Sequence, residues 1–226
     1  MVKRGIFLFI LAILSLIYIF GQEIITAEGY LRLISDNYAS IRDYEANIVI
    51  RSGNTDMIGS VSHLSPSFLR IDFTRPAQQV IVFNRETLII YLPEYRAILS
   101  QDINQSRVSG VGMASAQGLS LLRNNYVPAF LTGPNPVPLD NNSTEMVVKL
   151  RLTRRYVSEG FREIILSINP DTRLIRRIEG RTIADADVRF DFTNIRTNVG
   201  IPEARFIYDA PASANMYNNF LFRDSD

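Results

Sequence analysis

At 226 residues, the chain is long enough for one β-rich domain with a sizeable buried core. Its 24 basic and 23 acidic residues nearly cancel and are interspersed, which argues against a surface for nucleic acid. The absence of cysteine excludes disulfides, thiol nucleophiles, cysteine metal ligands and attachment of a lipid at a cysteine.

The N-terminal segment is predicted to direct export. Lys3 and Arg4 are followed by an apolar run from Gly5 to Phe20 that is interrupted by a single serine. This run is short for the ~20 residues of a membrane-spanning helix and is near the upper length of a signal-peptide core. We therefore expect residues 1–22 to be a signal peptide or, if they are not cleaved, an inner-membrane anchor, and residues 23–226 to form one domain outside the cytoplasm.

An amphipathic helix and two strands are predicted next. From Glu23 to Asp43 the apolar residues recur at spacings of three and four, which places them on one helical stripe: Ile24, Ala27, Leu31, Ile34, Tyr38 and Ile41. The runs Tyr44 to Arg51 and Met57 to Leu64 are typical of strands, with a turn between them.

The segment from Ser67 to Gln101 is predicted to form an antiparallel meander. It contains four strand-like runs separated by turn residues: Phe68 to Thr74, Gln79 to Phe83, Leu88 to Leu92 and Tyr95 to Ser100. The first run alternates between apolar and polar residues, as a strand with one buried face does. The two middle runs are apolar on both faces, which indicates cover on both sides or a lining exposed to an apolar ligand.

The remainder of the chain adds a second set of strands. After a polar loop at 102–112, Met113 to Tyr126 is predicted to be a short helix. Val127 to Asn142 holds four of the ten prolines and is predicted to be a mobile segment and a candidate lid. Strands are then expected at Met146 to Thr153, Phe161 to Ile168, Leu174 to Glu179, Val188 to Thr193 and Arg205 to Tyr208.

About eleven strand-like runs, two helices and no βαβ alternation predict the fold class. It is α+β and mostly β: a single strongly curved antiparallel sheet, an open half-barrel, with helices covering its concave side.

Side chains typical of catalysis are scarce. His63 is the only histidine and is expected to be a surface or hydrogen-bonded strand residue. The pair Asp185 and Asp187 lies beside a turn and is interpreted as solvated rather than catalytic. Neither a GxSxG nor an SxxK motif occurs. We therefore expect no enzymatic activity, no cofactor and no metal.

Five arginines of the strand regions are interpreted as a solvated outer face: Arg70, Arg75, Arg96, Arg176 and Arg177. The alternative is that one of them lies at the mouth of an apolar cavity, where it could bind an acyl carbonyl or a headgroup.

Three segments resemble motifs of the LolA family of periplasmic lipoprotein carriers and of the wider LolA/LolB-like superfamily. The family's x-P-x-x-(F/L)-R-(W/I) strand corresponds to Ser65–Ile71, its central hairpin to Asn84–Pro93, and its closing A-x-F-x-F-x-x-P to Ala204–Pro211. The chain departs from the family pattern at two positions. Ser65 stands where Arg or Lys is frequent, and Ile89 stands where the hairpin has Trp.

The resemblance implies a periplasmic carrier that shelters the acyl chains of lipoproteins in a hydrophobic cavity and moves them from the inner to the outer membrane. Its partners would be acylated lipoproteins or lipids, an inner-membrane release complex and an outer-membrane receptor, and the protein would be a monomer. We expect the sheet and the covering elements to line the cavity through Leu69, Ile71, Phe73, Ile81, Phe83, Ile89, Tyr91, Ile24, Leu31, Ile34 and Phe130, with Arg70 at its mouth. An envelope-located regulatory module that senses lipid or binds a protein, built on the same scaffold, is the alternative.

Overall fold

The computed structural model describes residues 25–102 and 113–219. Helices α2 (Ala27–Ala39) and α3 (Ala116–Asn125) accompany one large sheet, and two 3-10 turns, η2 (Pro93–Tyr95) and η5 (Glu203–Phe206), lie between strands. The strands are β1 (Asp43–Ser52), β2 (Thr55–Leu64), β3 (Phe68–Arg75), β4 (Val80–Asn84), β5 (Thr87–Leu92), β6 (Ala97–Asp102), β7 (Tyr126–Phe130), β8 (Val137–Pro138), β9 (Met146–Arg154), β10 (Phe161–Ile168), β11 (Ile175–Thr182), β12 (Asp187–Thr197) and β13 (Asn215–Asn218).

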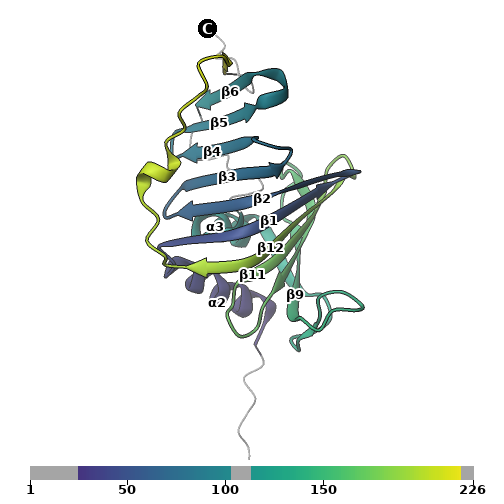
Figure 1. The fold of residues 1–226 in the computed structure, drawn as a ribbon. Helices are drawn as coiled ribbons and strands as arrows, with labels where there is room; N and C mark the ends of the chain where they lie inside the picture. Colours follow the sequence, from purple (N-terminus) through teal and green to yellow (C-terminus); the bar gives the residue numbers. More distant parts are fainter. Residues whose placement is uncertain (1–24, 103–112, 220–226) are drawn as a thin grey trace, which may run out of the picture.

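The sheet is two meanders joined edge to edge. Strands β1 to β6 pair in sequence, β9 to β12 pair in sequence, and β1 pairs with β12 to unite them into a 13-stranded sheet (Figure 1). The sheet ends at β13, which runs parallel to β6, and at β7, so it stays open. The predicted open, curved antiparallel half-barrel is confirmed.

Helix α2 begins and ends at polar caps. The Thr26 hydroxyl accepts a hydrogen bond from the Gly29 amide at 3.0 Å, and the Ser40 hydroxyl donates to the Asn37 carbonyl at the other end. The helix therefore ends at Ala39, and the prediction that it continues to Asp43 is wrong because Asp43 already pairs with β2. Leu31, Ile34 and Tyr38 are buried against the sheet.

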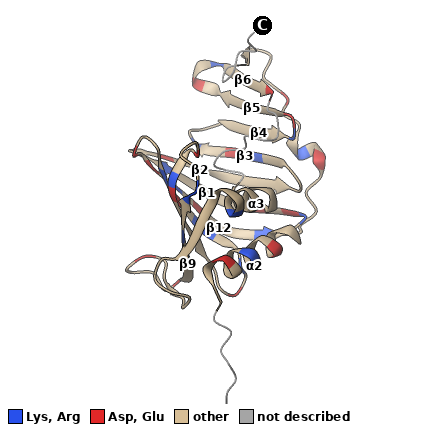
Figure 2. Ribbon diagram, turned by 180° about the vertical axis from the view of Figure 1, so that it is seen from behind, with Lys and Arg blue, Asp and Glu red and all other residues tan. Residues whose placement is uncertain are grey.

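Both helices lie on the concave side of the sheet. Figure 2 shows α2 and α3 side by side across the region of β1, β2 and β12, whereas no described helix crosses β4, β5 or β6. Helix α3 is short because Tyr126 adopts an extended backbone and begins β7. Its buried residues, Leu119 and Leu122, join the stripe of α2 in one apolar core.

Register explains which strand residues face that core. Leu150, Leu166, Ile178, Phe190 and Ile50 are successive cross-strand partners from β9 to β1, and all five are buried. Because cross-strand partners point to the same face of a sheet, this row defines the inner face. Residues one position away in each strand point to the outer face.

The proline-rich segment, predicted as a candidate lid, pairs with β9 and is fastened to the outer face beyond it. Strands β7 and β8 both pair with β9. The Lys149 Nζ atom donates to the Leu139 carbonyl at 2.9 Å, and the Arg177 guanidinium binds both carboxylate oxygens of Asp140. Only the start of the segment reaches the helices, where the ring of Phe130 lies 5.9 Å from that of Tyr30.

His63 lies on a strand as predicted, but it is not at the surface. The side chain is buried, its ring stacks on Tyr44 at 5.0 Å, and its Nδ1 atom has no hydrogen-bond partner among the described residues. Burial lowers the pKa of His63 to about 4, against a smaller opposing effect of the Asp43 charge. The neutral imidazole is therefore the form that the fold accommodates.

Acidification is expected to destabilise the protein through His63. The folded-state pKa of His63 lies below the value of 6.5 for a free histidine. The stability that the neutral imidazole contributes is therefore complete above pH 6.5 and is lost as the pH falls towards 4. The loss amounts to about 3 kcal/mol over this window. Urea unfolding from pH 7 to 4 measures it, with His63→Phe as the control that keeps a ring on Tyr44. Parallel pH profiles for the two proteins would contradict the prediction.

Candidate functional site

Most of the predicted cavity residues share the inner face. Leu69 is the cross-strand partner of Phe83, Ile71 is the partner of Ile81, and Phe73 belongs to the same apolar cluster. Leu31 and Ile34 of α2 are fully buried in this cluster, and Phe130 packs against it. Ile24 lies outside the described residues. The structure thus brings together strand and helix residues that are up to about half the chain apart in sequence.

Two predicted residues lie on the opposite face. The hairpin from β4 to β5 pairs Phe83 with Leu88 and Val82 with Ile89. Ile89 and Tyr91 therefore face outward, where Ile89 packs against a second cluster and Tyr91 lies 5.9 Å from the ring of Tyr208. The prediction that Ile89 and Tyr91 share a face with Phe83 is wrong. A shift of one residue in register moves a side chain to the other face of a strand.

The inner face of β5 instead presents Leu88 and Ile90, which sequence reasoning missed. Ile90 is the partner of Ile81 on one side and of Leu99 on the other. Ile81, Leu88, Ile90 and Leu99 are all partly exposed, in contrast to the fully buried core beneath the helices. We call these four residues the inner apolar wall. Aliphatic side chains of this kind favour a hydrocarbon ligand and offer no group for acid–base chemistry.

A buried hydroxyl lies where α2 meets β7. The Tyr30 hydroxyl, beside Phe130, has no hydrogen-bond partner within the described part of the chain. Burial raises the pKa of Tyr30, and the nearby Arg173 charge opposes this rise. The phenol is therefore protonated at neutral pH and can donate a hydrogen bond.

Arg70 also faces outward, so its predicted position at the cavity mouth is wrong. Its guanidinium binds Asp72 and donates to the Arg205 carbonyl at 3.0 Å. Arg205 in turn pairs with Asp72, and Phe206 packs on Phe68 with ring centroids 5.2 Å apart. These contacts hold the segment Val199–Ala210, which we call the outer strap, against β3, β4 and β5. The strap accounts for the apolar outer face of these strands.

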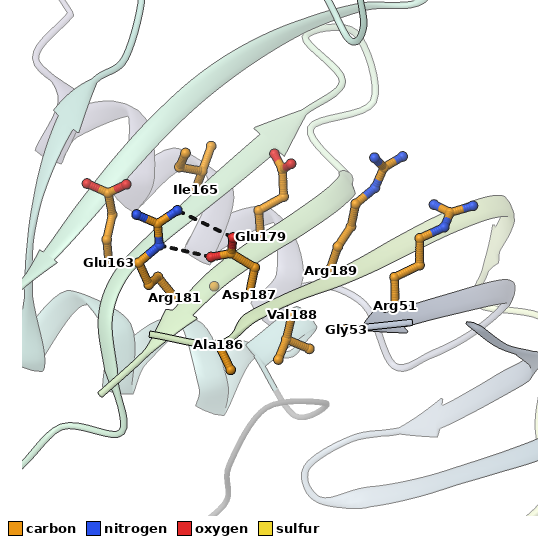
Figure 3. Close-up of a pocket in the computed structure, with 11 residues that line it drawn as sticks. Arg51, Gly53, Glu163, Ile165, Glu179, Arg181, Ala186, Asp187, Val188 and Arg189 are labelled. Carbon is orange, nitrogen blue, oxygen red and sulfur yellow. Dashed lines mark hydrogen bonds and ion pairs between the residues drawn. The ribbon is translucent and has the colours of Figure 1, made fainter. Parts of the chain in front are cut away.

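A further depression lies on the outer face near the β1–β2 and β11–β12 hairpins. It has a volume of about 570 Å³ and is lined largely by charged residues (Figure 3). Arg181 and Asp187 pair across it at 2.9 Å, while Arg51 and Arg189 bind Asp191 at 2.9 and 2.6 Å. Most of its charged side chains therefore have an ion-pair partner within or beside the depression, and this polar lining makes it a poor candidate for an apolar ligand.

Within residues 25–102 and 113–219, the structure shows neither a metal-binding cluster nor a membrane-spanning helix. No group of three or more His, Cys, Asp or Glu side chains there is arranged to hold a metal ion. Neither of the described helices has the length and apolar content that crossing a membrane requires. The predicted N-terminal signal or anchor lies outside these residues.

Comparisons with known proteins identify the fold. No family model matches the sequence, and no curated protein matches it. An uncharacterized conserved protein from Thermus thermophilus superposes with a TM-score of 0.55 at 14% identity, covering 83% of this chain and 98% of that chain. MucB, in the Pseudomonas aeruginosa MucA/MucB complex, superposes with a TM-score of 0.50 at 15% identity over 84% of this chain, and this chain spans 62% of its length.

A LolA superfamily protein from Nitrosomonas europaea aligns with 81% of this chain and 98% of its own, at 14% identity and a TM-score of 0.40. Identities at this level describe a shared architecture rather than a shared activity. The superpositions at TM-scores of 0.55 and 0.50 show that this chain shares its fold, an open sheet with two concave-side helices, with the Thermus thermophilus protein and with MucB.

Proposed function

We propose that the protein is a non-enzymatic periplasmic carrier that shelters the acyl chains of lipoproteins and moves them from the inner to the outer membrane. The observation that carries this proposal is the inner apolar wall, a partly exposed aliphatic surface continuous with the core beneath α2 and α3. Each methylene that moves from water onto such a surface contributes about 0.8 kcal/mol. One or two acyl chains therefore give ample gross affinity.

The helices set the capacity of the site. Side chains of α2 and α3 already fill the concave side over β1 and β12, with Leu31, Ile34 and Leu119 fully buried. An acyl chain would bind first on the wall at β4 to β6, which neither described helix covers, and deeper entry would require the helices to move away from the sheet. Return of the helices then favours release to an inner-membrane or outer-membrane partner with its own apolar site.

The likeness to MucB motivates a second candidate function. MucB has been solved in complex with MucA, and its TM-score to this chain reaches 0.50. In that case the domain would be an envelope-located regulatory module whose ligand is a partner protein, with or without lipid.

Charge placed on the wall should abolish lipid binding. Ile90→Asp is expected to lower the lipid-bound fraction about tenfold or more, because a carboxylate facing an acyl chain loses its hydration without gaining a partner. Native mass spectrometry of the protein purified from the cell envelope measures bound acyl species directly.

Ile89→Asp is the matched control, because it adds the same charge at the adjacent position of β5 but on the outer face. It should keep its lipid, and thermal unfolding checks that both variants are folded. Equal lipid occupancy in Ile90→Asp and the parent protein would overturn the carrier proposal. A parent protein without lipid but with a stably bound protein would favour the regulatory module.

A further inference from the structure

Two hairpin turns at one end of the sheet form a single projecting tip. The turn from β9 to β10 and the turn from β11 to β12 are joined by a hydrogen bond from the Ile183 amide to the Gly160 carbonyl at 3.2 Å. Arg162 reinforces this link, since it donates to the Ile183 carbonyl at 2.7 Å and pairs with Asp185 at 2.7 Å. The two turns therefore project as a unit, which we call the twin-turn tip.

The twin-turn tip exposes large apolar side chains. Val157 is 83% exposed, Tyr156 is 58% exposed and Ile183 is 55% exposed. Turns are normally rich in small and polar residues, and apolar side chains gathered at one exposed place mark an interaction site. At the tip these exposed side chains stand together on two joined turns, whereas other strongly exposed apolar residues, such as Tyr95 and Ile207, lie elsewhere on the chain.

The charges around these side chains favour an anionic surface. Arg154 donates to the Val157 carbonyl at 3.2 Å, and the neighbouring Arg155 is exposed; the described residues provide no ion pair for either. Asp185 is already neutralised by Arg162. Glu159 is then the one acidic residue of the first turn without an ion pair in the described part of the chain, so the unpaired charge of this turn is positive.

The base of the tip is tied to α3. The Arg155 amide donates to the Asn125 carbonyl at 2.7 Å, which ties the first turn to the C-terminal end of α3. The last turn of α3 contributes another cation, Arg123. A tip that exposes apolar side chains among arginines is suited to a lipid surface, because the apolar side chains can enter the headgroup region while the arginines bind its anions.

We propose that the twin-turn tip docks the protein onto an anionic lipid bilayer. Val157 and Ile183 would enter the headgroup region, Tyr156 would lie at the interface that tyrosine prefers, and Arg154 and Arg155 would bind lipid phosphates. Docking of this kind goes beyond cargo binding and does not depend on the inner apolar wall.

A tryptophan reporter tests the docking, because the chain contains no tryptophan of its own. Emission from Val157→Trp should shift to shorter wavelength when vesicles of phosphatidylcholine and phosphatidylglycerol are added, and much less with phosphatidylcholine alone. The matched control is Ile207→Trp, at another strongly exposed apolar position, on the outer strap, which should not shift. An unchanged spectrum for Val157→Trp, or equal shifts for both reporters, would overturn the proposal.

A second substitution added to Val157→Trp tests which side chains contact the bilayer. Arg155→Ala should raise the vesicle concentration at half-maximal shift about fivefold, and Ile183→Asp about tenfold. Ile90→Asp, which removes the proposed acyl site, should leave the shift unchanged, so the two proposals can fail separately. Full docking by Ile183→Asp, or loss of docking by Ile90→Asp, would overturn the assignment to the tip.

Discussion

Replacing Asp191 by alanine is expected to lower the free energy of unfolding by about 3–5 kcal/mol. The Asp191 side chain is only 8% exposed and binds Arg51, Arg177 and Arg189 at 2.9, 2.6 and 2.6 Å. Burial alone would raise its pKa, but the hydrogen bonds and charges of Arg189 and Arg177 outweigh burial and lower it. Without the carboxylate, the 4% exposed Arg177 would keep its charge with Asp140 as its remaining partner.

Urea unfolding at neutral pH measures this loss, and two further variants locate its cause. Asp191→Asn keeps the size of the side chain but not its charge, so it should lose nearly as much stability as Asp191→Ala. Asp187→Ala breaks an ion pair that is exposed on the same outer face and should have no measurable effect. A loss below about 1 kcal/mol for Asp191→Ala would mean that the three arginines do not depend on this carboxylate.

The strands were predictable because their signals are local. Phe161–Ile168 is bounded by turn residues and matches β10 residue for residue, and the alternation after Phe68 matches β3. Curvature and openness followed from the number of strands and from the resemblance. The predicted last strand at Arg205–Tyr208 was wrong, since Glu203–Phe206 is a 3-10 turn whose apolar residues are anchored by partners distant in sequence.

The candidate site was half predictable, and register is the reason. Both faces of β5 are apolar, so composition could not separate Ile89 from Ile90. The signal that could have separated them is the short turn at Arg85–Glu86, which the Thr87 amide closes by donating to the Asn84 Oδ1 atom and after which Phe83 pairs with Leu88. Counting outward from that turn places Leu88 and Ile90 on the face of Phe83.

The arginines could not be placed from sequence, because their partners are remote. Arg176 and Arg177 were interpreted as solvated, yet a register shift between β10 and β11 turns both to the same face, where they meet Asp191, Glu145 and Asp140. Such ion pairs depend on strand register and on a loop crossing the outer face. Neither is encoded in the local pattern of one strand.

A second large loss of stability is expected from a substitution in the outer strap. Phe206→Ala should lower the free energy of unfolding by about 3–5 kcal/mol, the range for removal of a buried phenylalanine. Phe206 is 1% exposed and packs on Phe68 in a cluster with Leu64, Val82 and Ile201. Because this cluster covers the outer face of β3 and β4, the cavity left by the missing ring would loosen the strap where it crosses them.

Ile207→Ala is the matched control, since Ile207 is the next residue of the strap but is 71% exposed. Its effect should stay within about 0.5 kcal/mol. Limited proteolysis extends the comparison: cleavage within residues 199–210 should accelerate in Phe206→Ala and not in Ile207→Ala, because local opening exposes the strap before the sheet unfolds. Equal stability and equal cleavage rates in the two variants would show that Arg70, Asp72 and Arg205 hold the strap without its aromatic anchor.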